Sequence, residues 1–335
     1  MAKVKIQGHA SGTGVLTVTA PNTSTDRTIT LPDETGTLLT TAAVPITTTA
    51  TSNIGLGANA VDSITTGDYN VGLGDSAGTA ITEGSHNTAI GFQAMLTNTT
   101  GSTNTAVGRD SMRMNLTGSN NVGMGYEALY ANTSGSDNIA IGRRALDANT
   151  TANSNVAVGT SSLTNNTIGG ANTAIGSSSL GANTTASNNT AVGHYSLLAN
   201  TTGASNVAVG KDALTANTTG AYGTGIGQGA LTANTTGEYN TAVGRNALAA
   251  NTTASHNTSV GTNSLDANTT GEYNTALGKN ALGANTTAAY NTAVGGLSLA
   301  VNTTGHSNTA SGMNSLASNT TGNYNTASGY AALYA

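Results

Sequence analysis

The stretch NTAVGRNALAANTT, residues 240–253, recurs with variations through most of the chain at a fixed spacing, and this spacing indicates the architecture. Its first residue, Asn240, belongs to a series of asparagines that recurs with a 17-residue period from Asn53 to Asn325. The series is broken once, at Gly223, and no residue is inserted or deleted along it. A fixed period indicates stacked, equivalent units. We number the positions of each unit 1 to 17 from this asparagine; residues 53–335 hold 17 units, the last ending at position 11.

Two aliphatic columns follow from this numbering. Position 4 is Leu, Ile, Val or Met in 15 of 17 units, and position 9 is Leu in 13. The Asn, Thr and Gly content opposes helix, and a unit of this length is too short for two useful helices. At ~3.3 Å per residue one unit has a contour of about 56 Å, enough for one turn of a β-coil. We therefore predict an all-β fold, a rod-like parallel β-solenoid of 17-residue coils with positions 4 and 9 as its core.

The alternation within the strand NTAVG predicts which side chains point inward. We expect positions 2 and 4 to face the core and positions 1, 3 and 5 to face outward. The outward face would then hold only Asn, Ala and Gly, and we expect it to pack against another chain. Because each coil has a thin core and an exposed edge, we predict a homo-oligomer, most simply a homotrimer.

A second signature is Asn at position 12, present in 14 of 16 units and followed by Thr-Thr or Thr-Ser and then Gly or Ala in most of them. It predicts a turn with left-handed geometry at Asn and positive φ at Gly. Stacked asparagines could also hydrogen-bond from coil to coil.

Composition excludes several functions. The chain has no Cys, so thiol catalysis and disulfides are ruled out, and only 7% of its residues are charged, with a net charge of -5. Nucleic acid is an unsuitable ligand because no basic cluster could neutralise several phosphates. No apolar run is long enough to span a bilayer, and Met1–Gly8 lacks the apolar region of a secretory signal. We expect neither membrane insertion nor export by that route.

Catalytic, cofactor and metal sites are not expected. The five histidines are scattered, and only His86 and His256 share a column, ten units apart. Two alternatives stay open: a carboxylate pair formed across chains for glycan hydrolysis, and ice binding by the Thr columns at positions 13 and 14. Without a secretory signal, we interpret the Asn-Thr-Thr runs as turns rather than glycosylation sites.

Surface recognition residues are sought in two columns. Positions 6 and 7 hold six of the ten basic residues and are expected at a solvent-facing corner. Position 17 carries six tyrosines, which could be platforms for sugar rings or could pack over the Asn-Thr-Thr turns. The candidates are Tyr239, Tyr273, Tyr290, Tyr324, Tyr330, Arg245 and Lys279.

The ends of the chain differ from the array. Residues 1–39 are predicted to form a small β attachment module and residues 40–52, with Pro45, a linker; residues 53–335 form the shaft. The module has strand-like runs at Val4–Gln7, Val15–Thr19 and Thr28–Leu31. The first two coils are atypical, as a cap requires. In the last two coils Ser311 and Ser328 occupy position 4. We expect this end either to be closed by three chains that swap their ends or to be covered by another protein.

The runs NTAVGRNALAANTT (240–253) and NTALGKNALGANTT (274–287) resemble the head repeats of trimeric autotransporter adhesins and, more closely, the longer repeats of bacteriophage tail-fibre proteins. The opening GHASGTGVLTVTAPNTSTDRTITLPDETGTLLTT (8–41) is similar to the opening segment of many phage fibre or virion structural proteins. The adhesin resemblance implies a trimeric parallel β-roll. The phage resemblance implies a virion component.

The expected function is a non-enzymatic tail fibre without cofactor, assembled in the host cytoplasm and carried outside on the virion. Residues 1–39 would attach it to a virion body protein. Its partners at the host end would be a surface glycan or a separate tip protein. The alternatives are a purely structural head or collar fibre or extracellular filament, and a bacterial surface adhesin.

Overall fold

The computed structural model describes residues 4–7, 15–18 and 52–334. The chain divides into two units, Met1–Thr40 and Thr41–Ala335, which are considered separately. In the first, β1 (Val4–Gln7) pairs antiparallel with β2 (Val15–Val18). These strands confirm two of the three predicted runs. The third run, Thr28–Leu31, and residues 40–51 of the predicted linker lie outside the described residues.

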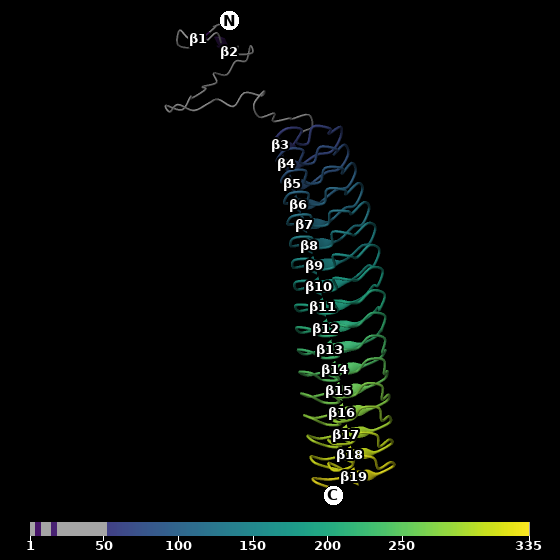
Figure 1. The fold of residues 1–335 in the computed structure, drawn as a ribbon. Coiled ribbons are helices and arrows are strands. Elements are labelled where there is room, and N and C mark those ends of the chain that lie inside the picture. The colour runs from purple at the N-terminus through teal and green to yellow at the C-terminus, as the bar shows by residue number, and fades with distance from the viewer. Residues whose placement is uncertain (1–3, 8–14, 19–51, 335) are drawn as a thin grey trace. The chain divides into compact units, whose positions relative to one another are not determined.

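The second unit is a parallel β-solenoid, as predicted (Figure 1). Each coil contributes one short strand, at positions 2 to 4, which pairs in parallel with the strand of the next coil, so that Thr241 lies opposite Thr258. No helix occurs among the described residues. The strands are β3 (Ile54–Leu56), β4 (Val71–Leu73), β5 (Thr88–Ile90), β6 (Thr105–Val107), β7 (Val122–Met124), β8 (Ile139–Ile141), β9 (Val156–Val158), β10 (Thr173–Ile175), β11 (Thr190–Val192), β12 (Val207–Val209), β13 (Thr224–Ile226), β14 (Thr241–Val243), β15 (Thr258–Val260), β16 (Thr275–Leu277), β17 (Thr292–Val294), β18 (Thr309–Ser311) and β19 (Thr326–Ser328).

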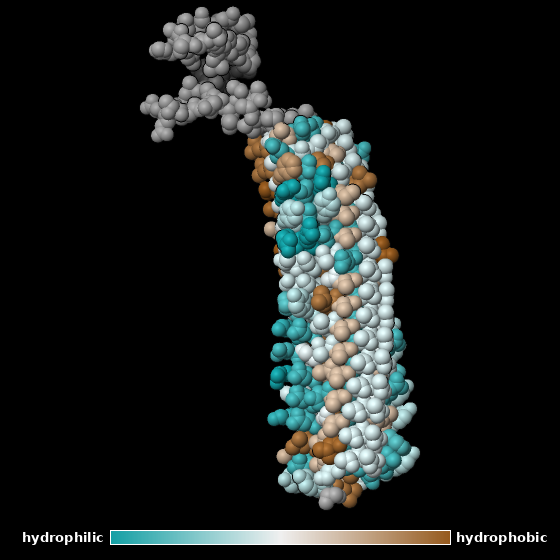
Figure 2. All heavy atoms as spheres, in the orientation of Figure 1, coloured by the Kyte–Doolittle hydropathy of each residue, from teal (hydrophilic) through white to brown (hydrophobic). Residues whose placement is uncertain are grey.

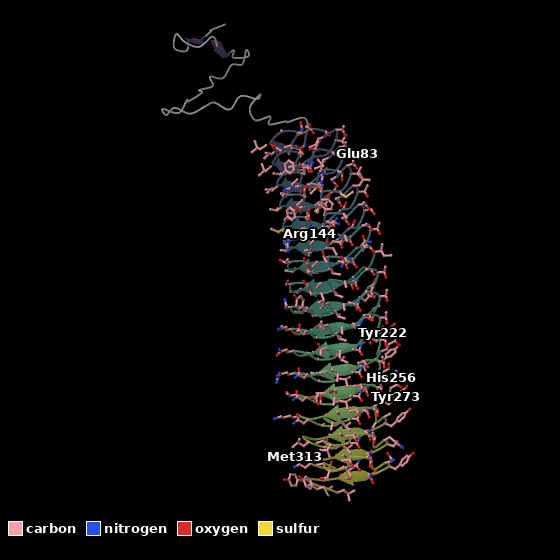
Figure 3. All side chains as sticks on the ribbon, viewed as in Figure 1. Glu83, Arg144, Tyr222, His256, Tyr273 and Met313 are labelled. Carbon is pink, nitrogen blue, oxygen red and sulfur yellow. The ribbon has the colours of Figure 1, made fainter. Side chains whose placement is uncertain are left out.

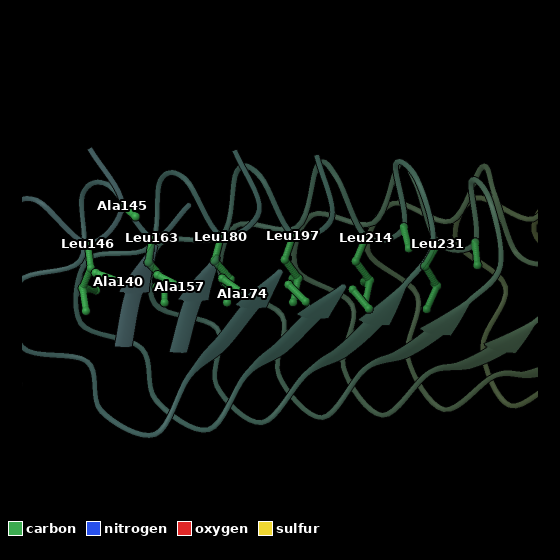
Figure 4. Packing of buried hydrophobic residues seen from close by; sticks show 14 of the residues in the cluster. Ala140, Ala145, Leu146, Ala157, Leu163, Ala174, Leu180, Leu197, Leu214 and Leu231 are labelled. Carbon is green, nitrogen blue, oxygen red and sulfur yellow. The ribbon is translucent and has the colours of Figure 1, made fainter. Parts of the chain in front are cut away.

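The core is a column of leucines facing a column of alanines. The position 9 leucines from Leu129 to Leu299, such as Leu248, are fully buried, which confirms that half of the prediction, whereas Leu333 in the last coil is 59% exposed. Opposite them lies the central residue of each strand, Ala242 in β14, and Ala247 at position 8 is equally buried. Figure 4 shows these leucines stacked one per coil beside the alanines. The apolar core is therefore thin, because each of these coils contributes only one leucine to it.

The prediction for the strand faces was wrong by one residue. Position 3 points inward, whereas positions 2 and 4 point outward, with Ile141 and Val294 at 38% and 40% exposed. The physical reason is the width of the coil. A Cβ placed on Gly225 would already lie 3.3 Å from Leu214, so the space between strand and leucine column accepts Ala but no larger aliphatic side chain. The small-residue face is thus internal and cannot be a contact between chains.

Two columns of asparagine replace the apolar core at the other side of the coil. The position 12 amides form the predicted ladder, in which Asn251 Nδ2 donates to Asn234 Oδ1 at 2.8 Å. The position 1 asparagines, expected to face outward, are also buried. Asn257 shows their role: its Nδ2 donates to the carbonyl of Gly271, and its backbone N–H donates to Asn240 Oδ1. The motif asparagine therefore ties the strand to the turn within a coil and to the next coil.

The first two coils differ, as the sequence indicated. Ile64 and Ile81 occupy position 12 and are buried where later coils carry the amide ladder, which begins at Asn98. Apolar packing therefore replaces hydrogen bonding at this end of the solenoid.

The left-handed backbone conformation occurs at positions that the sequence did not identify. Positions 7, 9 and 17 are left-handed, as in Asn246, Leu248 and Tyr239 with φ of 53°, 54° and 55°. Neither Asn at position 12 nor Gly at position 15 has positive φ, so that part of the turn prediction was wrong. The glycine that needs its freedom is at position 5. Gly244 has φ of +131°, and a Cβ there would lie 2.7 Å from the carbonyl carbon of Gly261 in the next coil. This explains why position 5 is Gly in all 17 units.

Candidate functional site

The seven predicted recognition residues lie in two separate columns. Tyr239, Tyr273, Tyr290 and Tyr324 occupy position 17, two residues before the strand, whereas Arg245, Lys279 and Tyr330 occupy position 6, two residues after it. Figure 3 shows Tyr222, His256 and Tyr273 projecting from one side of the solenoid and Met313, at position 6, from the opposite side. The structure therefore does not bring the seven residues into one site.

Five consecutive coils carry a stack of aromatic rings at position 17. We name this set the aromatic ladder: Tyr222, Tyr239, His256, Tyr273 and Tyr290. Successive ring centroids are 4.9, 5.1, 4.8 and 5.3 Å apart, and successive planes differ by 9° or less. The spacing follows from the distance between paired strands, which is about 4.8 Å. Each coil thus supplies one rung.

The residues that carry the ladder rings have an unfavourable, left-handed backbone conformation. Tyr239 and His256 have φ of 55° and 61°, in the left-handed region, which costs an ordinary residue roughly 1 kcal/mol and suits Asn or Asp better. Other coils do place Asn120, Asp137 and Asn188 there. Stacking of neighbouring rings offsets this cost in the five coils that carry the ladder. The tyrosines remain 47–61% exposed.

Ring stacking limits the predicted use of the tyrosines as sugar platforms. Within the ladder each inner ring has neighbours on both faces at about 5 Å, which leaves no room for a third ring between them. Only the outer faces of Tyr222 and Tyr290 are left, beside Ser205 and Ser307 in the flanking coils. Tyr324 stands apart from the ladder, with its ring edge-on to His306.

The sequence prediction named three tyrosines of the ladder and missed two of its members. Tyr222 belongs to the predicted tyrosine column but not to the candidates, and the sequence groups His256 only with the distant His86. Its ring lies between those of Tyr239 and Tyr273 and continues the stack. The available signal was the run of ring-bearing residues at position 17 in successive units.

The position 6 corner is exposed, as predicted. Arg245 and Lys279 form no ion pair with any described residue, and Lys211 lies 3.6 Å from the carboxylate of Asp212. Near the N-terminal end of the array, Arg109 lies between two rings of the same column, 5.9 Å from the centroid of Phe92 and 5.7 Å from that of Tyr126. These are cation–π distances.

A compact charge cluster surrounds Arg109. Its Nε lies 3.0 Å from the nearly buried carboxylate of Asp110, and Arg144 Nε lies 2.7 Å from Glu127. Burial raises the pKa of Glu127, but hydrogen bonds with Tyr126 and Arg144 outweigh it and hold that pKa below its ordinary value. The paired charges leave this cluster nearly neutral.

The remaining acidic groups are dispersed. In the part of the chain that the structure describes, no three His, Asp or Glu side chains gather as metal ligands. Burial is the main cause that raises the pKa of Asp147 and of Asp266, seven coils apart at position 10.

A hollow of about 340 Å³ lies at the C-terminal end, where Leu316, Asn319 and Leu333 contribute to its lining. Nor does any helix among the described residues have the length and apolar character to cross a membrane.

Comparison with known proteins adds no identification. The sequence matches no protein-family model, and neither the curated proteins nor the solved structures compared with it include a significant match.

Proposed function

We propose that this chain is the shaft of a homotrimeric, non-enzymatic virion fibre, most simply a tail fibre that contributes to attachment at the host surface. The single observation that carries the proposal is an exposed apolar surface that runs along the solenoid through 15 of its 17 strands. We name it the aliphatic face: positions 2 and 4 of strands β3 to β17. Part of the surface of the solenoid is seen in Figure 2.

The aliphatic face is unusual for a monomer. Positions 2 and 4 hold Thr, Val, Ile, Leu, Met or Ser in every coil and never a charged residue. Ile139, Ile141 and Met124 are 37%, 38% and 41% exposed. Monomeric proteins rarely expose a continuous apolar patch larger than a few hundred Å². A surface repeated over 15 strands therefore favours a covering partner.

A second copy of the chain is the partner that fits this face best. Only an array with the same coil spacing can keep its side chains in register with the face over its full length. Parallel chains around a common axis also give a closed assembly in which every copy uses the same surface. The resemblance to trimeric adhesin and phage fibre repeats favours three copies. Residues 1–39 are, in this proposal, the attachment segment to the virion body.

The assembly is tested by placing charges on the aliphatic face. The double variant Val243→Asp, Leu277→Asp should lower the mass measured by light scattering from trimer to monomer while the far-ultraviolet circular dichroism stays unchanged. Thr253→Asp, Thr287→Asp is the matched control, because those residues are exposed at position 14 of the same two coils. The control should remain a trimer. Equal loss of mass in both variants would point to general destabilisation and contradict the assignment of the face.

Attachment is tested separately with host cells. Labelled wild-type protein should adsorb to them, and replacing exposed rings or cations, Tyr290→Ala or Lys279→Ala, should reduce adsorption if the shaft makes the contact. If neither the wild-type chain nor a longer fibre that contains it adsorbs to host cells, the alternative function holds, and the chain is a structural spacer.

A further inference from the structure

The aromatic ladder contains two pairs of neighbouring tyrosines that sequence reasoning did not single out as pairs. The rings of Tyr222 and Tyr239 are 4.9 Å apart and inclined by 7°, and those of Tyr273 and Tyr290 are 5.3 Å apart and inclined by 4°. All 11 tyrosines of the chain lie within the described residues, and no other two have stacked rings. The two pairs are separated by His256.

We propose that Tyr222–Tyr239 and Tyr273–Tyr290 are sites of oxidative coupling, at which a peroxidase-type one-electron oxidant forms dityrosine cross-links between adjacent coils. The proposal concerns the chain itself and does not depend on the fibre function.

The chemistry needs only the two phenols and the oxidant. The oxidant removes one electron and one proton from each phenol, which leaves unpaired spin on the ring carbons ortho to the oxygen. A carbon–carbon bond then forms between one Cε of each ring, and the proton on each coupled carbon moves to its own oxygen to restore the phenol. For each cross-link, hydrogen peroxide accepts the two electrons and two protons and becomes two molecules of water.

The solenoid supplies the arrangement that this coupling requires. Strand pairing holds the two rings of each pair one coil apart, so the radicals need not diffuse to meet. The rings are about half exposed, so the oxidant can reach them and each can rotate about its side-chain bonds from the stacked to the coupled geometry. Coupling within a chain should also be independent of protein concentration.

His256 limits the reaction to two links. It occupies the rung between Tyr239 and Tyr273, which are therefore two coils apart, roughly 10 Å at the usual strand spacing. Imidazole does not form dityrosine, so these tyrosines should not couple with one another. The ladder is thus divided into two reactive pairs.

Each link would join the same position of two successive coils and so close one coil covalently. A cross-link that closes a loop restricts the unfolded chain and opposes its unravelling. Cross-linked protein should therefore be cleaved more slowly by a protease within residues 222–290 than untreated protein is.

The test uses the purified full chain with peroxidase and hydrogen peroxide. Dityrosine fluorescence and mass mapping of peptides should show the links Tyr222–Tyr239 and Tyr273–Tyr290, with a yield per chain that is unchanged by tenfold dilution. The products should keep the single-chain mass on a denaturing gel. Tyr222→Phe, which keeps the stacked ring, should remove the first link only. Tyr195→Phe is the matched control, because that ring contacts His194 and no tyrosine, and it should leave both links.

A gain of function complements these losses. His256→Tyr should add links within residues 239–273, because the ladder then has tyrosine on every rung. The proposal is overturned if coupling follows exposure instead of pairing, so that Tyr324 and Tyr330, at 76% and 75% exposed, dominate the map. It is equally overturned if no link forms while free N-acetyltyrosine in the same reaction is coupled. Because the wild-type map alone decides this, a variant that fails to fold does not obscure the result.

Discussion

Gly223, the one break in the asparagine series, should be a weak point that a single substitution repairs. In the other coils from Asn53 to Asn308 the position 1 asparagine donates its Nδ2 to the carbonyl at position 15 and accepts the N–H of the next position 1 residue, as Asn257 does with Gly271 and Asn274. At Gly223 both bonds are missing, and the backbone N–H of Asn240 is buried without a partner among the described residues.

The expected gain for Gly223→Asn is about 2 kcal/mol. Two restored hydrogen bonds contribute about 1 kcal/mol each, and replacing Gly lowers the entropy of the unfolded chain by about 0.5 kcal/mol, from which the ordering of the new side chain is subtracted. A Cβ on Gly223 would lie 3.0 Å from Asn206 Oδ1, so that amide has to shift by a few tenths of an ångström, and 3.7 Å from Leu214, which is an ordinary contact.

Hydrogen exchange at the Asn240 amide is the most specific assay. In Gly223→Asn this amide should become protected, and the denaturant midpoint should rise at equal chain concentration. Gly223→Ala is the control, because it adds the Cβ but no amide and should give only the entropic part of the gain. If the Asn and Ala variants have the same midpoint and the same exchange at Asn240, the structural role assigned to the motif asparagine is refuted.

Three further predictions concern single positions. Asp266→Asn should raise the thermal midpoint at pH 7 but not at pH 3. Burial raises the pKa of Asp266, so the wild-type fold loses stability as the pH rises above the ordinary carboxyl range. Equal shifts of the midpoint at both pH values would contradict this. Gly244→Ala should cost about 3 kcal/mol or more in unfolding free energy, since its φ of +131° is open only to Gly, whereas Gly283→Ala, whose Cβ meets nothing closer than 3.4 Å, should change it by less than about 1 kcal/mol. Leu231→Ala should lower the unfolding free energy by roughly 2–5 kcal/mol in a denaturant titration, because Leu231 is the single buried leucine of its coil. A decrease below about 1 kcal/mol would show that the coil collapses into the space left by the side chain.

The period of the sequence predicted the architecture, because a 17-residue lattice without insertion admits few folds. The leucine column and the position 12 amide ladder were also predictable, since both are single residue types repeated in register. Which side chains of the strand point inward was not predictable from the sequence. Position 4 looked like core because it is aliphatic, but only the coil width shows that Ala242 fits against Leu248 and that Val243 must point outward.

The candidate site was predictable only as a column. A sequence shows that Tyr239, His256 and Tyr273 share a position, but not that strand spacing brings their rings to stacking distance. The left-handed backbone at these residues was equally hidden, because Leu and Tyr are not the residues expected there. Local propensity failed at these residues because packing between coils determines their conformation.

The mass of the intact wild-type chain in solution decides whether other copies cover the aliphatic face. If the aliphatic face is covered by other copies, sedimentation equilibrium should give three times the chain mass of 32.8 kDa, and the value should hold on dilution to low micromolar concentration. A stable species of 32.8 kDa at those concentrations would contradict the account, because the solenoid would then keep its apolar face exposed without a second copy to cover it.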